Sequence, residues 1–149
     1  KTMNRRGVLK NIGWLSSMLT RQLDIMCSER KLSGVEGRTL HFILTSDRDI
    51  FQKDIEFDSH LKPSTVSEML KRMEQKGMIK RESVPYDARL KKIVATKKVS
   101  KLKEEVISDM EMLDERLTEG ITDDEIKVFD EICKKFIGNL KKLEENSKS

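Results

Sequence analysis

The sequence predicts a mainly α-helical protein that contains one small β-hairpin. Charged residues make up 38% of the 149 residues and aromatic residues only 5%, a balance that suits long, solvated helices. Only 2 Pro and 7 Gly occur, too few for a fold built from loops. Apolar residues recur every three or four positions over most of the chain, interrupted by a pair of short Ile- and Val-rich segments. This length favours one domain, because two domains would each have a thin core.

The first part of the chain is expected to form three helices. The first covers Val8 to Arg30, and Ser33-Gly34 is expected to end it. The second covers Glu36 to Thr45, and a short third helix spans about Phe51 to Ser59. The apolar positions that define the first two at helical spacing are Val8, Ile12, Leu15, Leu19, Leu40, Ile43 and Leu44.

A fourth helix and a hairpin follow. The helix runs from Pro63 to Lys76, with Pro in its first turn and Gly77 just past its end, as is usual for helices. Met78 to Val84 and Leu90 to Ala95 are rich in Ile and Val and flank residues 85–89. This pattern predicts two strands joined by a charged tip.

Two helices are expected after the hairpin. Residues 97–119 return to helical spacing. Thr122-Asp123-Asp124-Glu125 fits a capping box, in which Thr and Glu side chains satisfy backbone donors at the start of a helix. The last helix then carries a broad apolar stripe, and the polar end of the chain, Glu144 to Ser149, is expected to fray.

The net charge of +4 conceals an uneven distribution. Residues 60–103 contain 13 Lys+Arg against 4 Asp+Glu, a net charge of +9, whereas residues 104–149 contain 7 against 14, a net charge of −7. A segregated positive region attracts polyanions. Nucleic acid is therefore a candidate partner, to be weighed against an ordinary solvated surface by the residue types within the region.

The helix from Pro63 to Lys76 has an apolar and a polar side. At 100° per residue its apolar stripe consists of Val66, Met69, Leu70 and Met73. The other side has short hydroxyls near the helix start and long basic side chains further on, which suits a helix that enters a DNA major groove. The expected DNA contacts are Ser64, Thr65, Ser67, Lys71 and Arg72, with Lys62 on a phosphate. Phosphates would repel Glu68 unless it accepts a hydrogen bond from a cytosine amino group.

Helix, turn, helix and hairpin in this order form a winged helix-turn-helix. The residues that carry a closer resemblance are Ser64-Thr65-Val66-Ser67, Met73 to Arg81, and Asp87 to Thr96. They resemble the MarR family of bacterial transcriptional regulators, whose pattern has hydroxyls at the start of the recognition helix, Lys-Gly near its end and an Asp-x-Arg hairpin. The resemblance is detailed over about Gln52 to Thr96, and the order of helices outside this range agrees.

The resemblance implies a DNA contact for the hairpin. In the family, the Arg that matches Arg89 typically enters the minor groove, and the Asp that matches Asp87 holds it in place. A narrow minor groove concentrates negative potential, which favours an Arg on a stiff hairpin. Lys91 and Lys92 are expected to contact phosphates. The turn before the recognition helix lacks the family's usual Gly, so either His60 adopts its backbone angles at some cost or the turn has another shape.

The terminal helices are expected to form a homodimer. Residues 1–33 and 97–149 are too apolar on one face to be solvated singly, and the small winged helix-turn-helix of residues 36–96 leaves them little to cover. Packing against a second copy solves this, and a twofold dimer presents two recognition helices to a palindromic site. The resemblance implies the same arrangement, so residues 1–149 are expected to form a single MarR-type domain.

The remaining residues with chemical potential are few. His41 and His60 do not predict a metal site, which needs clustered ligands. Because family members commonly bind small aromatic or anionic effectors between the dimer helices and the winged region, His41 could line such a pocket. Cys27, near the end of the first helix, is the candidate for oxidant sensing, since some relatives sense oxidants through a cysteine. No phosphate loop or catalytic motif occurs, which predicts a non-enzyme without cofactors.

The sequence therefore predicts a cytoplasmic regulator that binds double-stranded DNA as a homodimer, most simply a repressor of a palindromic operator that a small effector releases. No apolar run approaches the roughly 20 residues that span a bilayer, so no membrane contact is expected. Two alternatives remain open. One is a helical protein-interaction module whose basic patch binds an acidic partner, and the other is a cysteine-based oxidant-sensing regulator.

Overall fold

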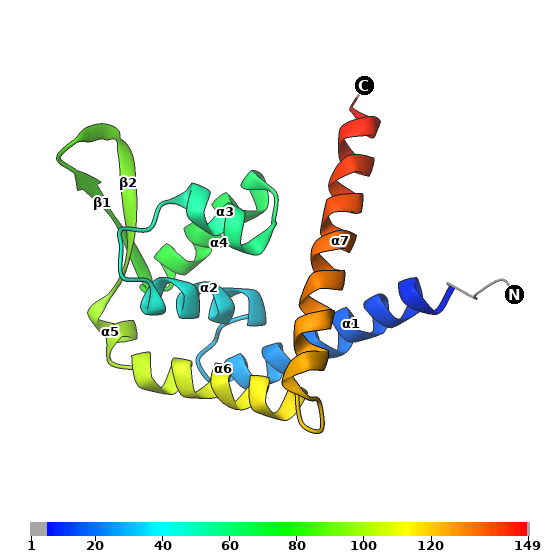
Figure 1. Cartoon of the computed structure of the whole chain (residues 1–149). Helices are drawn as coiled ribbons and strands as arrows, with labels where there is room; N and C mark the ends of the chain where they lie inside the picture. Colours follow the sequence, from blue (N-terminus) through cyan, green and yellow to red (C-terminus); the bar gives the residue numbers. More distant parts are fainter. Residues whose placement is uncertain (1–5, 149) are drawn as a thin grey trace, which may run out of the picture. The chain divides into compact units, whose positions relative to one another are not determined.

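The computed structural model describes residues 6–148 and confirms the predicted class, helices with a two-stranded antiparallel hairpin (Figure 1). The elements are α1 (Arg6–Ser28), α2 (Gly34–Thr45), α3 (Gln52–Ser59), α4 (Pro63–Gln75), β1 (Ile79–Val84), β2 (Asp87–Ala95), α5 (Lys97–Ser100), α6 (Lys103–Leu117) and α7 (Asp123–Ser147). Among residues 6–148, each helix is too short or too polar to cross a membrane.

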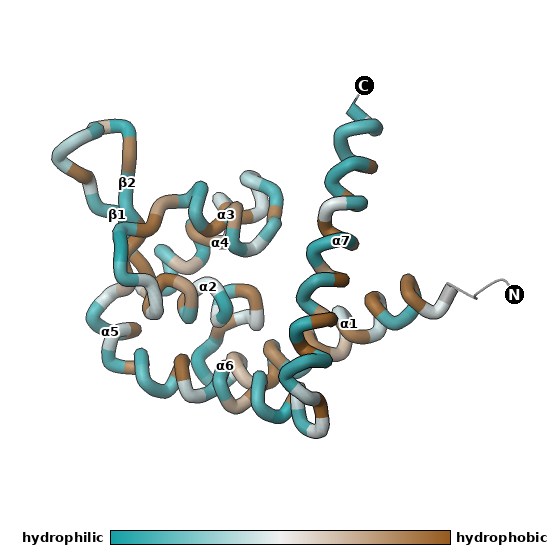
Figure 2. Tube along the Cα trace, in the orientation of Figure 1, coloured by the Kyte–Doolittle hydropathy of each residue, from teal (hydrophilic) through white to brown (hydrophobic). Residues whose placement is uncertain are grey.

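The chain divides into two compact units, Lys1–Met112 and Leu113–Ser149. The first unit holds α1 to α5, the hairpin and most of α6, and the second holds the end of α6 and α7. All the buried apolar side chains belong to the first unit, and α7 has no buried residue among those described. The core therefore lies in the first unit, while most apolar residues of α7, which Figure 2 colours brown, are exposed.

The core of the first unit contains one side of α4. Its four apolar residues are each at most 2% exposed, as the helical spacing predicts: Val66, Met69, Leu70 and Met73. They belong to one cluster with Leu40 of α2, Ile55 of α3 and Ile79 of β1. Because this stripe is buried on one side, the polar side of α4 faces solvent.

The hairpin is anchored at its base. β1 pairs with β2 in antiparallel register, with Ile79 opposite Ala95 and an irregularity between Ser83 and Val84. The Thr96 hydroxyl donates to the Gly77 carbonyl at 2.7 Å, and the Ile93 N–H donates to the Ile50 carbonyl at 2.7 Å. These bonds fix the strands to the segments around α2 and α4, and the tip extends beyond α3 and α4 (Figure 1).

Two glycines allow α2 to lie close to α1. A Cβ on Gly34 would overlap the side chain of Leu23, and a Cβ on Gly37 would overlap the sulfur of Cys27. In the turn after α1, Arg30 donates to Asp109 at 2.8 Å and to Glu105 at 3.2 Å, both on α6. The carboxyl-terminal half of α1 is therefore held to α2 by close packing, and the turn that follows it is held to α6 by ion pairs.

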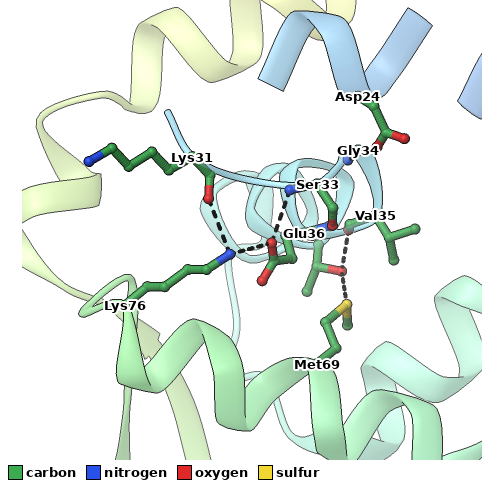
Figure 3. A network of polar contacts seen from close by, with 9 residues as sticks. Asp24, Lys31, Ser33, Gly34, Val35, Glu36, Met69 and Lys76 are labelled. Carbon is green, nitrogen blue, oxygen red and sulfur yellow. Dashed lines mark hydrogen bonds and ion pairs between the residues drawn. The ribbon is translucent and has the colours of Figure 1, made fainter. Parts of the chain in front are cut away.

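Glu36 forms a buried polar network between the start of α2 and the end of α4 (Figure 3). Its carboxylate is 3% exposed and accepts hydrogen bonds from the Ser33 N–H at 2.9 Å and the Lys76 ammonium at 2.8 Å. Lys76 also donates to the Lys31 carbonyl at 3.1 Å. Burial alone would raise the Glu36 pKa, but the hydrogen bonds from Lys76 and Ser33 outweigh it and hold the pKa below the ordinary 4.5.

The sequence predicts that Ser33-Gly34 ends the first helix, but in the structure these residues begin the second. α1 ends at Ser28, and Lys31 takes a positive φ of 58° in the turn. The Ser33 hydroxyl instead accepts from the Glu36 N–H at 3.2 Å, which makes Ser33 the N-cap of α2 and adds Gly34 to that helix. The predicted boundary was wrong because Ser is a helix-start signal as well as a loop residue.

Three further boundaries differ from the predicted ones. Residues 97–119 form two helices, because the Leu102 N–H bonds the Val99 carbonyl in a tight turn between α5 and α6. β2 begins at Asp87, so only Pro85-Tyr86 separates the strands. α7 continues to Ser147, since Lys and Glu are good helix formers despite their polarity.

His60, in the turn before α4, takes a left-handed conformation with φ of 56°. This confirms the first of the two expected shapes of the turn, in which His60 adopts the backbone angles of the family's usual Gly.

Replacement of Glu36 by Gln should lower the free energy of unfolding by about 1–3 kcal/mol at pH 7, because Lys76 loses a charged acceptor. The folded pKa of Glu36 lies below its ordinary value, so the stabilisation is full above pH 4.5 and is lost as the pH falls through the folded pKa. Urea unfolding at several pH values should therefore give a difference between the two proteins that shrinks on acidification.

Glu82→Gln is the matched control, because Glu82 forms ion pairs at the surface, and it should cost at most about 1 kcal/mol. A Glu36→Gln difference that stays constant or grows on acidification would contradict the proposed role of the carboxylate.

Candidate nucleic-acid interface

The outer face of α4 carries the residues predicted to contact DNA. All of them are exposed: Lys62, Ser64, Thr65, Ser67, Lys71 and Arg72. Pro63 occupies the first helical position, the N-cap residue Lys62 makes no side-chain hydrogen bond to the helix, and the first turn has no acidic residue. The positive end of the helix dipole therefore points outward without a carboxylate, an arrangement that suits an anion such as a phosphate.

α3 and the turn after it hold the start of α4. The Gln52 side-chain amide donates to Glu56 at 3.1 Å and to the Pro63 carbonyl at 3.4 Å, so it links α3 to the first turn of α4. The His60 N–H donates to the Glu56 carbonyl at 3.0 Å, and the Leu61 N–H donates to the Ser59 hydroxyl at 3.2 Å. The sequence did not identify Gln52, because helical spacing does not say which polar residue of a short helix faces its neighbour.

Asp87 and Arg89 form a tightly linked pair at the start of β2. The Arg89 guanidinium donates to both oxygens of the Asp87 carboxylate at 3.2 Å, and the Arg89 N–H donates to one of them at 2.9 Å. These hydrogen bonds lower the Asp87 pKa below its ordinary 3.8. The Arg89 side chain is 89% exposed, so Asp87 orients it without covering it.

Lys91 and Lys92 point to opposite sides of β2, because successive side chains of a strand alternate. The Lys91 ammonium donates to the Ser83 hydroxyl across the hairpin at 2.6 Å and remains exposed. The Lys92 ammonium lies 3.8 Å from Asp49 and 3.9 Å from Glu82. Lys91 is thus the better placed of the two for a phosphate. Ser83 was missed, although the register of the hairpin places it opposite Lys91.

Cys27 lies in the core and not at a reactive surface. It is 5% exposed, and burial raises the pKa of its thiol, an effect only partly offset by Arg30. Because the thiolate is the reactive form, these surroundings do not favour oxidation. His41 is half-buried on α2. The part of the chain that the structure describes has no cluster of three or more metal-ligating side chains.

Two hollows lie beside α2, and His41 is in the wall of neither. One has a volume of about 100 Å³ and includes Arg38, Thr39 and Phe42 in its wall. The other has a volume of about 320 Å³ and lies between the end of α2, β2 and the start of α6, with three basic residues in its wall: Arg48, Lys92 and Lys103.

Comparison with known proteins gives a consistent match. Residues 31–90, which include α2 to α4 and the hairpin tip, match the model of the MarR family. The transcription regulator MarR from Oenococcus oeni PSU-1 is 25% identical, with a TM-score of 0.82 over 88% of this chain and 98% of that chain. No curated protein sequence matches the chain.

Two further solved structures share the fold. The transcriptional regulator SlyA is 20% identical, with a TM-score of 0.77 over 89% of this chain and 93% of that chain. S. aureus MepR, solved as a complex with DNA, is 21% identical, with a TM-score of 0.77 over 93% of this chain and 99% of that chain.

Replacement of Arg89 by Ala should raise the pKa of Asp87 towards 3.8, because the guanidinium is the main cause of its lowering. The rise should be partial, since the backbone N–H of residue 89 still donates to the carboxylate. Carboxyl-carbon NMR titration measures this pKa directly. Lys91→Ala is the control, because it removes a neighbouring cation and should leave the Asp87 pKa unchanged. An equal effect of both variants would contradict the specific pairing of Asp87 with Arg89.

Proposed function

The chain belongs to the MarR family of winged helix-turn-helix, DNA-binding transcriptional regulators, and from this premise we propose that it is a cytoplasmic repressor of a palindromic operator. Members of this family are transcription factors and not enzymes. In the proposed mechanism a homodimer covers promoter DNA, and a small aromatic or anionic effector releases it.

The observation that carries the proposal is the pairing of two exposed polar surfaces in one compact unit. The outer face of α4 offers hydroxyls and cations, and the hairpin presents Arg89 held by Asp87. A helix of this type fits the major groove, whose base edges its first turns can reach. An oriented, exposed Arg on a hairpin fits the adjacent narrow minor groove. Lys62 and Lys91 are available for phosphates on either side.

The exposed apolar faces of α1 and α7 support a homodimer. On α1, the amino-terminal half exposes Val8, Leu9, Ile12, Leu15 and Met18 by 42–79% each. On α7, the exposed apolar side chains include Phe129, Ile132, Leu140 and Leu143. A second copy of the chain presents the same faces, so a twofold arrangement can cover both, and it places two α4 helices for two half-sites.

The support for a small effector is the larger of the two hollows beside α2. Its volume of about 320 Å³ lies within the usual range of ligand pockets. Its wall has three basic residues against one acidic residue, Asp49, and this positive balance suits an anion. Lys92 belongs both to this wall and to the predicted phosphate contacts, so an anion bound here would compete with DNA for the same cation. His41 has a smaller part in this proposal than the sequence had suggested, since it lies outside both walls.

Selection of bound sequences from a random DNA pool should recover an inverted repeat with half-sites about one helical turn apart, because a twofold dimer places equivalent α4 helices on one side of the duplex. Light scattering of the free protein should give the mass of a dimer at micromolar concentration. A pool without any enriched sequence would favour the interaction module with a basic patch, and a monomer in solution would contradict the dimer.

Replacement of Arg89 by Ala should weaken operator binding by about 1–3 kcal/mol at fixed salt, because the minor-groove contact is lost. Fluorescence titration measures the affinity at several salt concentrations. In a plot of the logarithm of the binding constant against the logarithm of the salt concentration, the slope should become less steep by about one if Arg89 also contacts a phosphate. Lys127→Ala on α7 removes one positive charge as well, but from the second unit, which contains neither α4 nor the hairpin. Equal affinities for these two variants would contradict the proposal that Arg89 of the hairpin contacts the minor groove.

A further inference from the structure

The basic region of residues 60–103 contains 4 acidic residues, and their partners differ. Three of them form ion pairs within the hairpin and the end of α4: Glu74 with Arg81 at 3.9 Å, Glu82 with Lys80 at 3.0 Å, and Asp87 with Arg89 at 3.2 Å. The fourth, Glu68, has no ion pair with any residue that the structure describes. Its charge is therefore not used to hold another side chain in place.

Glu68 lies at the centre of the outer face of α4. It is exposed and follows Ser64 by one turn, with Lys71 and Gln75 further along the same line of the helix. Lys71 and Arg72 are three and four residues away, the spacing that commonly forms helix ion pairs, yet neither ammonium nor guanidinium lies within 4.0 Å of the carboxylate in the described chain. The side chain is free to meet a ligand in the second turn of the helix, where a helix in the major groove reaches base edges.

A carboxylate in this position has few suitable partners on DNA. Phosphates repel it, and guanine and thymine present acceptors in the major groove. Adenine offers an amino group, but its N7 acceptor lies beside that group and repels a carboxylate. Cytosine offers its N4 amino group without a neighbouring acceptor on the same base, and the acceptor of the paired guanine suits a cation such as Lys71, which lies on the same face as Glu68.

We propose that Glu68 is a specificity-determining residue that accepts a hydrogen bond from the N4 amino group of a cytosine in each half-site. The proposal rests on the proposed function, in which α4 enters the major groove. It assigns a use to the one carboxylate of the basic region that the chain leaves unpaired among its described residues. It also defines a feature of the operator, a cytosine at one fixed position that the second turn of α4 reaches.

The test compares sequences selected from a random DNA pool by four full-length proteins: the wild type, Glu68→Gln, Glu68→Ala and the control Glu74→Gln. The wild type and the control should both favour cytosine at one position of each half-site, by about 5- to 150-fold over other bases. Glu68→Gln should shift that preference to adenine, because an amide can bond both N6 and N7. Glu68→Ala should lose the preference at that position only and retain the rest of the site.

Affinities for a random duplex complete the test. Both Glu68 variants should bind it more tightly than the wild type, since a repelled charge is removed, while they bind the selected cytosine site more weakly. If both variants instead keep the wild-type base preference and bind every duplex more tightly, Glu68 is only a repelling charge and the inference is wrong, although the regulator proposal stands. If the wild type enriches no sequence, both proposals are wrong. Circular dichroism checks that these exposed substitutions leave the fold intact.

Discussion

The burial of the apolar stripe of α4 is the constraint on which the rest of the interface depends. Val66, Leu70 and Met73 are fully buried, and Met69 nearly so. Each contributes about 1.5–3 kcal/mol relative to an exposed position. A rotation of α4 by one residue, or 100°, would bring Lys71 or Ser67 towards the core and expose part of this stripe. The rotation of the helix is thereby fixed, and with it the direction of the polar side chains that are proposed to contact DNA.

The network around Glu36 holds the carboxyl-terminal end of α4. Side-chain packing sets how the helix is rotated but allows small movements along its axis, whereas the Lys76 ammonium is held by both Glu36 and the Lys31 carbonyl (Figure 3). The same Glu36 caps α2 together with Ser33. The Glu36 carboxylate therefore joins the turn between α1 and α2 to the end of α4, while Gln52 joins α3 to the start of α4.

The features that could be predicted from the sequence are those with a local cause. The stripe of α4, the hairpin, and the capping box at Thr122 depend on residues near one another in the chain, and each is present. The Glu36–Lys76 contact joins residues 40 positions apart, so spacing alone could not reveal it, although Ser33-x-x-Glu36 is itself a capping pattern. The break between α5 and α6 was missed because helical spacing continues through it. The buried Cys27 depends on the close approach that Gly37 permits, which is a property of two helices and not of either one.

The two halves of α1 have different surroundings, and this difference connects the proposed dimer to DNA recognition. Its carboxyl-terminal half is held within the first unit by Leu23 and Cys27, which pack against α2, and the turn after it is held by Arg30, which pairs with α6. Its amino-terminal half exposes the apolar residues proposed to meet a second copy. A single helix thus belongs to the unit that carries α4 and to the proposed dimer contact. In a dimer formed through this face, the distance between the two recognition helices is set by rigid elements, which makes the spacing of the half-sites a property of the fold.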